Sequence, residues 1–319
     1  MHLVLGATGG FGGAMVRALL ARGERVRALV RTPARARLPA GVEIVAGDAS
    51  RMDDLLPAAK GCASIVHGVN LPYAEWDPGM IRVTDRVIEA SGLTGAAIVF
   101  PANIYGLKPI YDVPLPPDSP RIDSNDKPNR KGALRNLLED TLEQNSAMRN
   151  VRTLVVRAGD FYGPGVDNGL VGPMFRNALA GKPIPWFGAL ANAHAFTAVD
   201  DVAAVAVGAL LRSDRPTYDV LSVAGDVYPD AAAWAAALAT AAGKPSAGAT
   251  LVAGWKVRLL GLVDKQAREF AELLNQWDGP ILLDDARARR ALPDWTPTPA
   301  AASLAETMAW FRANPTGPS

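Results

Sequence analysis

The first half of the chain alternates short apolar blocks with segments that have the residue spacing of an amphipathic helix. The blocks predict strands at residues 2–5, 25–30, 42–45, 63–66 and 96–100, and the segments between them predict helices at 11–21, 52–59 and 80–90. Blocks that are apolar throughout are typical of strands covered on both faces, and strands that alternate with helices pair in parallel through right-handed crossovers. The pattern predicts an α/β fold with a doubly wound parallel sheet of the Rossmann type.

After residue 107 the pattern is less regular. Residues 108–128 are rich in proline, aspartate and serine and predict a long loop, which inside a compact domain is usually functional. Further strands are predicted at 151–156 and 218–223, and further helices at 129–144, 169–180, 200–211, 229–242, 255–275, 284–291 and 301–311. Asp200 and Asp201 are expected to cap the helix at 200–211.

These elements suggest two units that are not continuous in sequence. We expect residues 1–160 and about 190–225 to form a dinucleotide-binding domain. The remaining residues, about 161–189 and 226–319, are expected to form a smaller, mostly helical substrate lobe.

The composition excludes several classes of protein. Hydrophobic residues make up 49% of the 319 residues, and 33 basic side chains stand against 32 acidic ones, so the chain is neither disordered nor suited to binding nucleic-acid phosphates. The single cysteine, Cys62, excludes an internal disulfide, and the three histidines are too scattered for a metal site. No apolar run reaches the roughly 20 residues of a membrane span, and the first residues do not read as a signal peptide. We expect a cytoplasmic protein with no metal, membrane or nucleic-acid partner.

A glycine cluster, GATGGFG at residues 6–12, follows the first predicted strand and opens the first predicted helix. One glycine allows the tight turn, a second lets the backbone approach a pyrophosphate, and a third allows the helix to pack closely on the strand. The start of the helix offers unpaired N–H groups and partial positive charge to phosphates. The cluster therefore predicts a dinucleotide site. Its expected contacts are Gly6, Thr8, Gly9, Gly10, Phe11 and Gly12.

The Gly-x-x-Gly-x-x-Gly spacing of this cluster resembles the extended and atypical branches of the short-chain dehydrogenase/reductase superfamily. AGDAS at 46–50, IVHGVN at 65–70 and RAGDFYGPG at 157–165 are also similar to segments of that superfamily, and the late stretches 194–203 and 288–311 resemble its nucleoside-sugar epimerase/dehydratase-like branch. The resemblance implies a small-molecule substrate. It implies cofactor contacts from Asp48, Ala49, Gly68, Ala158 and Phe161, and substrate contacts from Tyr162 and His194. Phe161 and Tyr162 could instead pack in the core, and His194 could be a surface residue.

The end of the second predicted strand distinguishes NAD from NADP. A carboxylate there would bind the ribose 2′-hydroxyl of NAD, whereas an arginine would bind the 2′-phosphate of NADP. The sequence ALVRTPAR places Arg31 at this position, with Arg35 nearby, and a guanidinium matches a phosphate in bidentate geometry. We therefore expect NADP in preference to NAD, with a solvated surface arginine as the alternative interpretation.

The usual catalytic residues of the resembled superfamily are a serine or threonine followed by Tyr-x-x-x-Lys, and this chain lacks that motif. Aligned on the sequence NIYG at 103–106, Pro101 stands at the hydroxyl position. Aligned on Glu139, Lys131 stands at the tyrosine position and Arg135 at the lysine position. The chain therefore departs from the superfamily at each of the three catalytic positions.

Two interpretations of Lys131 follow. In the first, the Arg135 guanidinium one helical turn away disfavours a second positive charge, so Lys131 could donate or accept a proton while Arg135 binds ribose hydroxyls. This arrangement resembles isoflavone-reductase and phenylcoumaran-ether-reductase relatives. In the second, both are solvated helix charges, with Arg135 paired to Glu139. Tyr105 could also supply a proton and Asn103 could orient substrate, or both could be structural.

The leading functional hypothesis is an atypical NADP-dependent oxidoreductase that transfers hydride to or from a small carbonyl, enone or sugar-like substrate. The missing tyrosine leaves a second hypothesis open, a non-catalytic NADP-sensing protein that regulates a partner. A sugar-nucleotide epimerase or dehydratase is a third, although such enzymes normally depend on the tyrosine. Homodimers are common in the resembled superfamily, so a homodimer is the assembly that the resemblance suggests.

Overall fold

A computed structural model describes residues 1–122, 129–168 and 170–315. Its centre is a seven-stranded sheet with the order β10-β6-β5-β4-β1-β2-β3, in which all neighbours pair in parallel. The strands are β1 (His2–Leu5), β2 (Val26–Val30), β3 (Glu43–Ala46), β4 (Ser64–His67), β5 (Ala97–Ala102), β6 (Thr153–Ala158) and β10 (Tyr218–Val223). The predicted doubly wound Rossmann-type sheet is confirmed.

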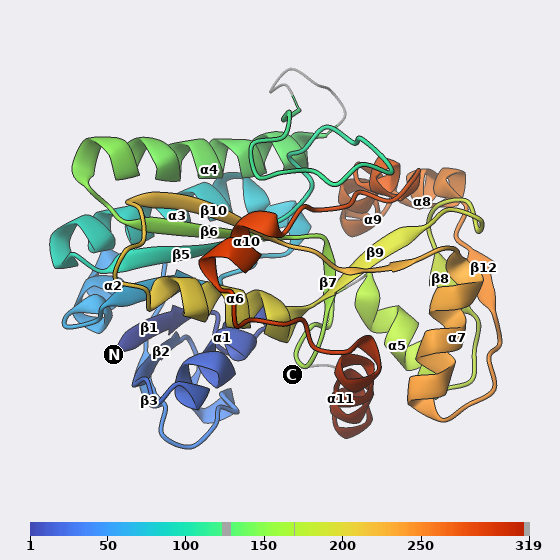
Figure 1. Cartoon of the computed structure of the whole chain (residues 1–319), viewed down its shortest axis with the longest axis horizontal. Coiled ribbons are helices and arrows are strands. Elements are labelled where there is room, and N and C mark those ends of the chain that lie inside the picture. Colours follow the sequence, from blue (N-terminus) through green and yellow to red (C-terminus); the bar gives the residue numbers. More distant parts are fainter. Residues whose placement is uncertain (123–128, 169, 316–319) are drawn as a thin grey trace.

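Helices cover both faces of this sheet (Figure 1). On one face lie α1 (Gly10–Ala21) and α6 (Val199–Leu210), and on the other α2 (Met52–Ala59), α3 (Trp76–Thr94) and α4 (Arg130–Arg149). Successive strand residues point to opposite faces, so Val4 joins the core under α1 and α6 whereas Leu3 and Leu5 join the core under α2 and α3. This double burial explains why the strands read as unbroken apolar blocks.

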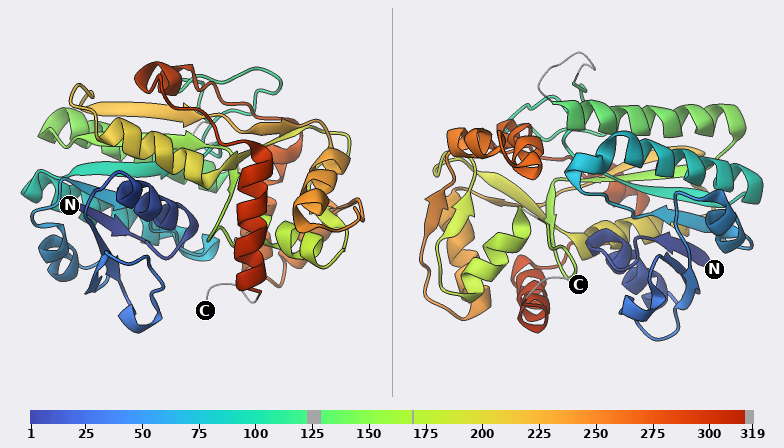
Figure 2. Two further views of the ribbon diagram at one scale, coloured as in Figure 1. Left: turned by 60° about the horizontal axis from the view of Figure 1, so that its bottom comes forward. Right: turned by 180° about the vertical axis from the view of Figure 1, so that it is seen from behind.

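The second lobe contains more strand than the sequence predicts. A three-stranded sheet has the order β11-β9-β7, and β12 pairs with β8. These strands are β7 (Asp160–Tyr162), β8 (Ile184–Trp186), β9 (His194–Ala198), β11 (Asp226–Tyr228) and β12 (Ala249–Leu251). Helices α5 (Val171–Leu179), α7 (Ala231–Ala242) and α11 (Ala300–Ala313) share an aromatic core with them, and Figure 2 shows α11 standing between this lobe and the Rossmann half.

The single helix predicted at 255–275 is wrong. The chain forms α8 (Gly254–Leu260), α9 (Lys265–Ala271) and a short 3-10 turn at Leu274–Trp277. The break has a local cause, because Asp264 caps α9 by accepting a hydrogen bond from the Ala267 N–H at 2.7 Å. Figure 2 shows α8 and α9 beside the ends of α3 and α4.

The expected capping by Asp200 and Asp201 is also wrong. The N-cap residue of α6 is Ala198, and both aspartates lie in the first turn. Asp200 accepts a hydrogen bond from Arg17 of α1 at 2.6 Å, and Asp201 accepts one from the Thr298 hydroxyl at 2.7 Å. The two carboxylates therefore tie α6 to other segments while still lying at the positive end of the helix dipole.

The predicted loop after residue 107 runs over the carboxyl ends of the strands without regular structure in its described part, 108–122. Isolated bridges join Leu107 to Arg121 and Leu115 to Leu283, and the predicted helix near 284 is α10 (Ala286–Ala291). The rest of this prediction, residues 123–128, lies outside the described residues, as does Gly169 at the start of another predicted helix.

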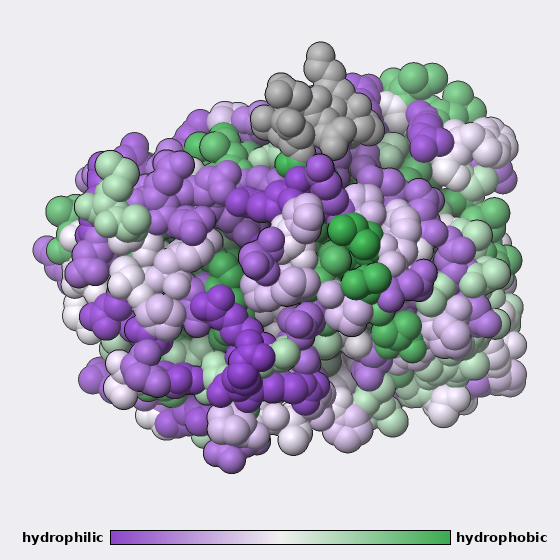
Figure 3. Space-filling model, turned by 45° about the horizontal axis from the view of Figure 1, so that its top comes forward, coloured by the Kyte–Doolittle hydropathy of each residue, from purple (hydrophilic) through white to green (hydrophobic). Residues whose placement is uncertain are grey.

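The face seen in Figure 3 is largely hydrophilic, with hydrophobic residues in separate patches. The described residues include no helix with the length and hydropathy that crossing a bilayer requires. They also include no group of three or more His, Cys, Asp or Glu side chains placed to hold a metal ion.

Candidate cofactor and substrate cleft

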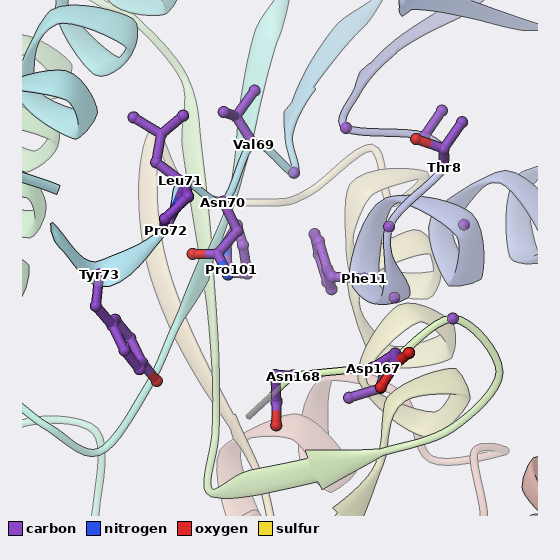
Figure 4. A pocket seen from close by; sticks show the side chains of 18 of the residues that line it. Thr8, Phe11, Val69, Asn70, Leu71, Pro72, Tyr73, Pro101, Asp167 and Asn168 are labelled. Carbon is purple, nitrogen blue, oxygen red and sulfur yellow. The ribbon is translucent and has the colours of Figure 1, made fainter. Parts of the chain in front are cut away.

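One large cleft lies at the carboxyl ends of the central strands. It opens where β1 has β2 on one side and β4 on the other, which is the point where the strand order reverses. Ligands of open α/β sheets bind at such points. In Figure 4, Thr8 and Phe11 lie on one wall and the segment from Val69 to Tyr73 lies on the opposite wall, with Asp167 and Asn168 on a third segment.

The turn from Gly6 to Gly12 is packed too tightly for larger residues. Gly6 has a positive φ of 67°, and a Cβ placed there would lie 2.2 Å from the Gly68 carbonyl oxygen. A Cβ on Gly12 would lie 2.1 Å from the Gly6 carbonyl oxygen. These glycines bring β1, β4 and α1 into direct backbone contact. Gly68 lines the cleft, whereas Gly12, predicted as a cofactor contact, is buried behind it.

The start of α1 can receive an anion. Its N-cap is Gly9, which is exposed, and none of the described side chains caps the helix. A Cβ on Gly9 would meet only the Gly6 carbonyl oxygen at 3.4 Å, so a ligand can approach the backbone closely. Gly6, Thr8, Gly9, Gly10 and Phe11 all line the cleft. Free N–H groups and the helix dipole suit a diphosphate here.

The far end of the cleft carries the residues predicted for the adenosine part of the cofactor. Arg31 and Arg35 are exposed and line the cleft beyond β2. Asp48 and Ala49 line it beyond β3. The Ser50 N–H donates to the Asp48 carboxylate at 2.8 Å and lowers the pKa of that group, so Asp48 is charged at neutral pH.

Several residues predicted to contact the cofactor or the substrate are buried and do not line the cleft. Ala158 is buried at the end of β6, Tyr162 is fully buried against Phe175, and neither lines the cleft, whereas Phe161 does. His194 is buried rather than on the surface, where it stacks on Trp277 with ring centroids 3.9 Å apart. The structure therefore does not bring Tyr162 or His194 to the cleft surface.

The structure does connect His194 to the cleft indirectly. Its Nε2 lies 2.9 Å from the carboxylate of Asp160, and Asp160 lines the cleft.

His67 also lines the cleft at the end of β4, where burial lowers its pKa to about 4 and keeps the imidazole neutral. Its Nε2 lies 3.0 Å from the Thr84 hydroxyl.

Lys131 is buried and does not line the cleft. Its ammonium forms an ion pair with Glu269 of α9 and donates a hydrogen bond to the Tyr73 carbonyl at 2.7 Å. The alternative, a solvated helix charge, is therefore wrong. Glu139 pairs with Arg157 at 2.6 Å, so the suggested Arg135–Glu139 pair is wrong as well.

Arg135 lines the cleft, and the start of α4 explains its position. Asn129 caps α4 by accepting from the Gly132 N–H at 2.8 Å and donates to the Tyr105 carbonyl at 3.1 Å. A Cβ on Gly132 would lie 2.1 Å from the same carbonyl, so the helix sits directly against this turn. The Arg135 side chain then extends from the first turns of α4 towards the cleft.

Two phenols stand beside Arg135. The hydroxyls of Tyr73 and Tyr105 lie 3.2 Å apart, and burial raises the pKa of both, for Tyr105 well above its ordinary value. Both are therefore neutral at physiological pH and can donate hydrogen bonds. Asn103 lines the cleft and accepts a hydrogen bond from the Tyr105 N–H at 3.1 Å, which fixes the turn.

Sequence reasoning missed Tyr73 and Trp76. Both belong to the segment LPYAEW, which follows β4 directly and lines the cleft. The signal was available, because residues that follow a strand in this fold lie at its ligand-binding edge.

Comparisons with known proteins agree with this architecture. Residues 2–224 match the model of the NAD dependent epimerase/dehydratase family. A curated relative, the 3-diazoavenalumate denitrifying reductase of a Streptomyces species, is 33% identical over 280 residues, which cover 81% of this chain and 86% of that protein.

Solved structures share the fold at low sequence identity. The crystal structure of gox2253 has a TM-score of 0.78 at 23% identity and covers 99% of both chains. The dTDP-glucose 4,6-dehydratase DesIV from Streptomyces venezuelae, with NAD and TYD bound, has a TM-score of 0.75 at 19% identity, covering 98% of this chain and 97% of that one. The UDP-glucuronic acid 4-epimerase from Bacillus cereus, in complex with NAD, has a TM-score of 0.75 at 15% identity, covering 98% and 99%.

Proposed function

The chain belongs to the NAD dependent epimerase/dehydratase family, and from this premise we propose that it is a reductase that uses NADPH to reduce a small electrophilic substrate. The cofactor, when bound, supplies the hydride. The protein supplies the binding site, the orientation of the substrate and the charges around it.

The cleft fits a nicotinamide dinucleotide. The turn from Gly6 to Gly12 would hold the diphosphate, since a Cβ on its tightest glycines would collide with backbone atoms. Asp48 and Ala49 would lie at the adenine. Arg31 and Arg35, both exposed on the cleft wall, supply positive charge suited to a 2′-phosphate and support NADPH over NADH.

A single observation carries the choice of a reductase. The dinucleotide turn is intact, but Pro101 stands at the hydroxyl position and Lys131, at the tyrosine position, is held in an ion pair away from the cleft. Oxidation of a substrate hydroxyl, with which epimerisation and dehydration of sugar nucleotides begin, requires a base for its proton. Burial raises the pKa of Tyr105, so the phenol stays protonated and no phenolate is available to accept that proton. Reduction instead moves hydride from the cofactor to the electrophile, and the substrate loses no proton to a base.

The curated relative supports the same direction of reaction. Its name describes a denitrifying reductase that acts on a diazo compound. For a diazonium ion, hydride alone completes the reduction: the carbon–nitrogen bond breaks, dinitrogen leaves with its electron pair, and hydride supplies the pair of the new carbon–hydrogen bond. No proton is consumed, so such a reaction makes no demand on the missing tyrosine. We therefore include diazonium ions with enones and carbonyls in the proposed class of electrophiles.

Deuterium transfer tests the proposal. NADPH labelled at the transferred position is incubated with the protein and with enones, carbonyls or an aryl diazonium salt, and products are examined by mass spectrometry. We expect net oxidation of NADPH and one deuterium in the product of at least one class. A reaction without protein is the essential control, because diazonium salts are reactive on their own.

Two results would contradict the proposal. Saturable NADPH binding with no oxidation across the whole panel would favour the sensing protein. Interconversion of a sugar nucleotide with no net change in the cofactor would favour the epimerase or dehydratase. A cytoplasmic location and a homodimer stay predictions, for which cell fractionation and light scattering are direct tests.

A further inference from the structure

Arg135 is a buried cation on the cleft wall without a counterion among the described residues. It is 8% exposed, and its guanidinium carbon lies 4.5 Å from the centre of the Trp76 ring and 5.8 Å from that of Phe100. Its one hydrogen bond to a described residue is a long one, 3.4 Å from Nη1 to the Pro101 carbonyl. Its Nε has no partner in the described structure.

The buried carboxylates nearby already have other polar partners. Glu139 on the next turn of α4 accepts from Arg157 at 2.6 Å, and Asp160 is bound to His194 at 2.9 Å. Glu269 pairs with Lys131. Apart from Glu139, which is paired with Arg157, the groups beside Arg135 are neutral or aromatic: Tyr73 and Tyr105 from two turns, Trp76 from α3 and Phe100 from β5.

A buried cation without a partner is unfavourable, and an anion that enters the same site removes the penalty. The Trp76 ring lies against the guanidinium, and the Arg135 side chain lines the cleft. An edge of a guanidinium matches the two oxygens of a carboxylate in a planar bidentate pair. Apolar side chains, among them Leu71, Phe161, Leu260 and Phe270, line the same cleft.

We propose that Arg135 binds a carboxylate of the substrate, so that the substrates of this protein are apolar, preferably aromatic, organic acids. The hydroxyls of Tyr73 and Tyr105 stand beside the carboxylate as neutral donors. This inference rests on the proposed function, since it assigns a substrate class to the same site. It replaces the ribose contact expected for Arg135 from the family resemblance, because neutral ribose hydroxyls would leave the buried charge unpaired.

The test is a binding measurement that needs no turnover. The full-length protein, saturated with NADP⁺, is titrated with cinnamate and with the neutral cinnamamide, and binding is followed by calorimetry. We expect cinnamate to bind at least about tenfold more tightly than cinnamamide. Arg135→Met should bring the two affinities within about twofold of each other while NADP⁺ affinity changes by less than about twofold.

Two further variants sharpen the test. Arg82→Met removes an exposed arginine of the same cleft and should leave the preference for cinnamate intact, which excludes general attraction by the positive cleft. Arg135→Lys keeps the charge but loses the planar fork, and should keep only part of the preference. It also serves as the informative variant if Arg135→Met does not fold, as judged by circular dichroism.

Four results would overturn the inference: no preference for cinnamate in the unaltered protein, the same preference in Arg135→Met, a loss of NADP⁺ affinity in that variant instead, or competition by inorganic phosphate as strong as that by cinnamate. The reductase proposal has a separate criterion. If cinnamate binds through Arg135 but no acid is ever reduced, the carboxylate site stands and the reductase proposal fails.

Discussion

Replacing Gly12 by alanine should destabilise the protein, although helix propensity alone predicts the opposite. Gly12 lies in the first turn of α1, and in a helix an alanine is favoured over glycine by about 1 kcal/mol. The new Cβ, however, would lie 2.1 Å from the Gly6 carbonyl oxygen and 2.6 Å from the Gly6 carbonyl carbon, so backbone must move by roughly an ångström to reach ordinary contact.

Overpacking of this kind costs about 1–3 kcal/mol, so against a propensity gain of about 1 kcal/mol the free energy of unfolding should fall by up to about 2 kcal/mol. The same movement displaces the start of α1, where the diphosphate would bind. A misplacement of roughly an ångström can reduce the efficiency of a positioned site by about a hundredfold. We therefore expect NADPH affinity to fall together with stability.

Gly92 provides the matched control. It also lies within a helix, α3, and is exposed, and no described atom lies within 4 Å of a Cβ placed there. Gly92→Ala should raise the free energy of unfolding by about 0.5–1 kcal/mol and leave NADPH binding unchanged. Urea denaturation followed by circular dichroism and calorimetric titration with NADPH measure both effects. If Gly12→Ala is as stable as Gly92→Ala and binds NADPH equally well, the reasoning about the turn is refuted.

Arg31→Asp should weaken NADPH binding by about ten- to a hundredfold and NADH binding far less, and equal losses would refute the 2′-phosphate assignment. His67 has a folded-state pKa of about 4, below its unfolded value, so the unfolded chain takes up a proton first and stability should fall as pH drops from 6.5 to 4, by about 3 kcal/mol in all. In His67→Asn, urea midpoints should lose this part of the pH dependence, and an unchanged slope would contradict the assignment. Lys131→Met should destabilise the protein by up to about 3 kcal/mol, because it removes the closer of the two cations at the buried Glu269 and leaves only Arg130 at 3.7 Å, and the double variant with Glu269→Leu should regain most of that stability. Turnover that survives in the stable double variant would exclude Lys131 as the acid–base residue, and its selective loss there would support that role.

The dinucleotide half could be predicted because its signals are local. The first strand, the glycine cluster and the first helix follow one another directly, and the parallel sheet reads as apolar blocks since both its faces are buried. The second lobe could not be predicted in the same way, because strands such as β8 and β12 have three residues each and are defined by pairing partners far away in sequence.

The charge pairs of the site, like the second lobe, could be predicted only in part from the sequence. The spacing from Glu139 places Arg135 on the same helix, α4. That Arg135 is not paired with Glu139 could not be predicted, because Glu139 pairs instead with Arg157 of strand β6. Lys131 likewise reads as a free helix charge until Glu269 of a distant helix is brought to it. Which charge pairs with which is a property of the packed chain, and only the spacing along one helix is visible in the sequence.

The ion pair between α4 and α9 limits how this scaffold could be re-engineered. Arg130 forms a second ion pair, at 2.8 Å, with Glu272 at the end of α9. The consecutive residues Arg130 and Lys131 therefore both bind α9 to the start of α4. The substitution Lys131→Tyr would introduce a phenol, but it would also remove one of these ion pairs and leave the buried Glu269 without its closest cation. Introducing a tyrosine at this position would therefore need a matching exchange at Glu269, at the other end of the ion pair.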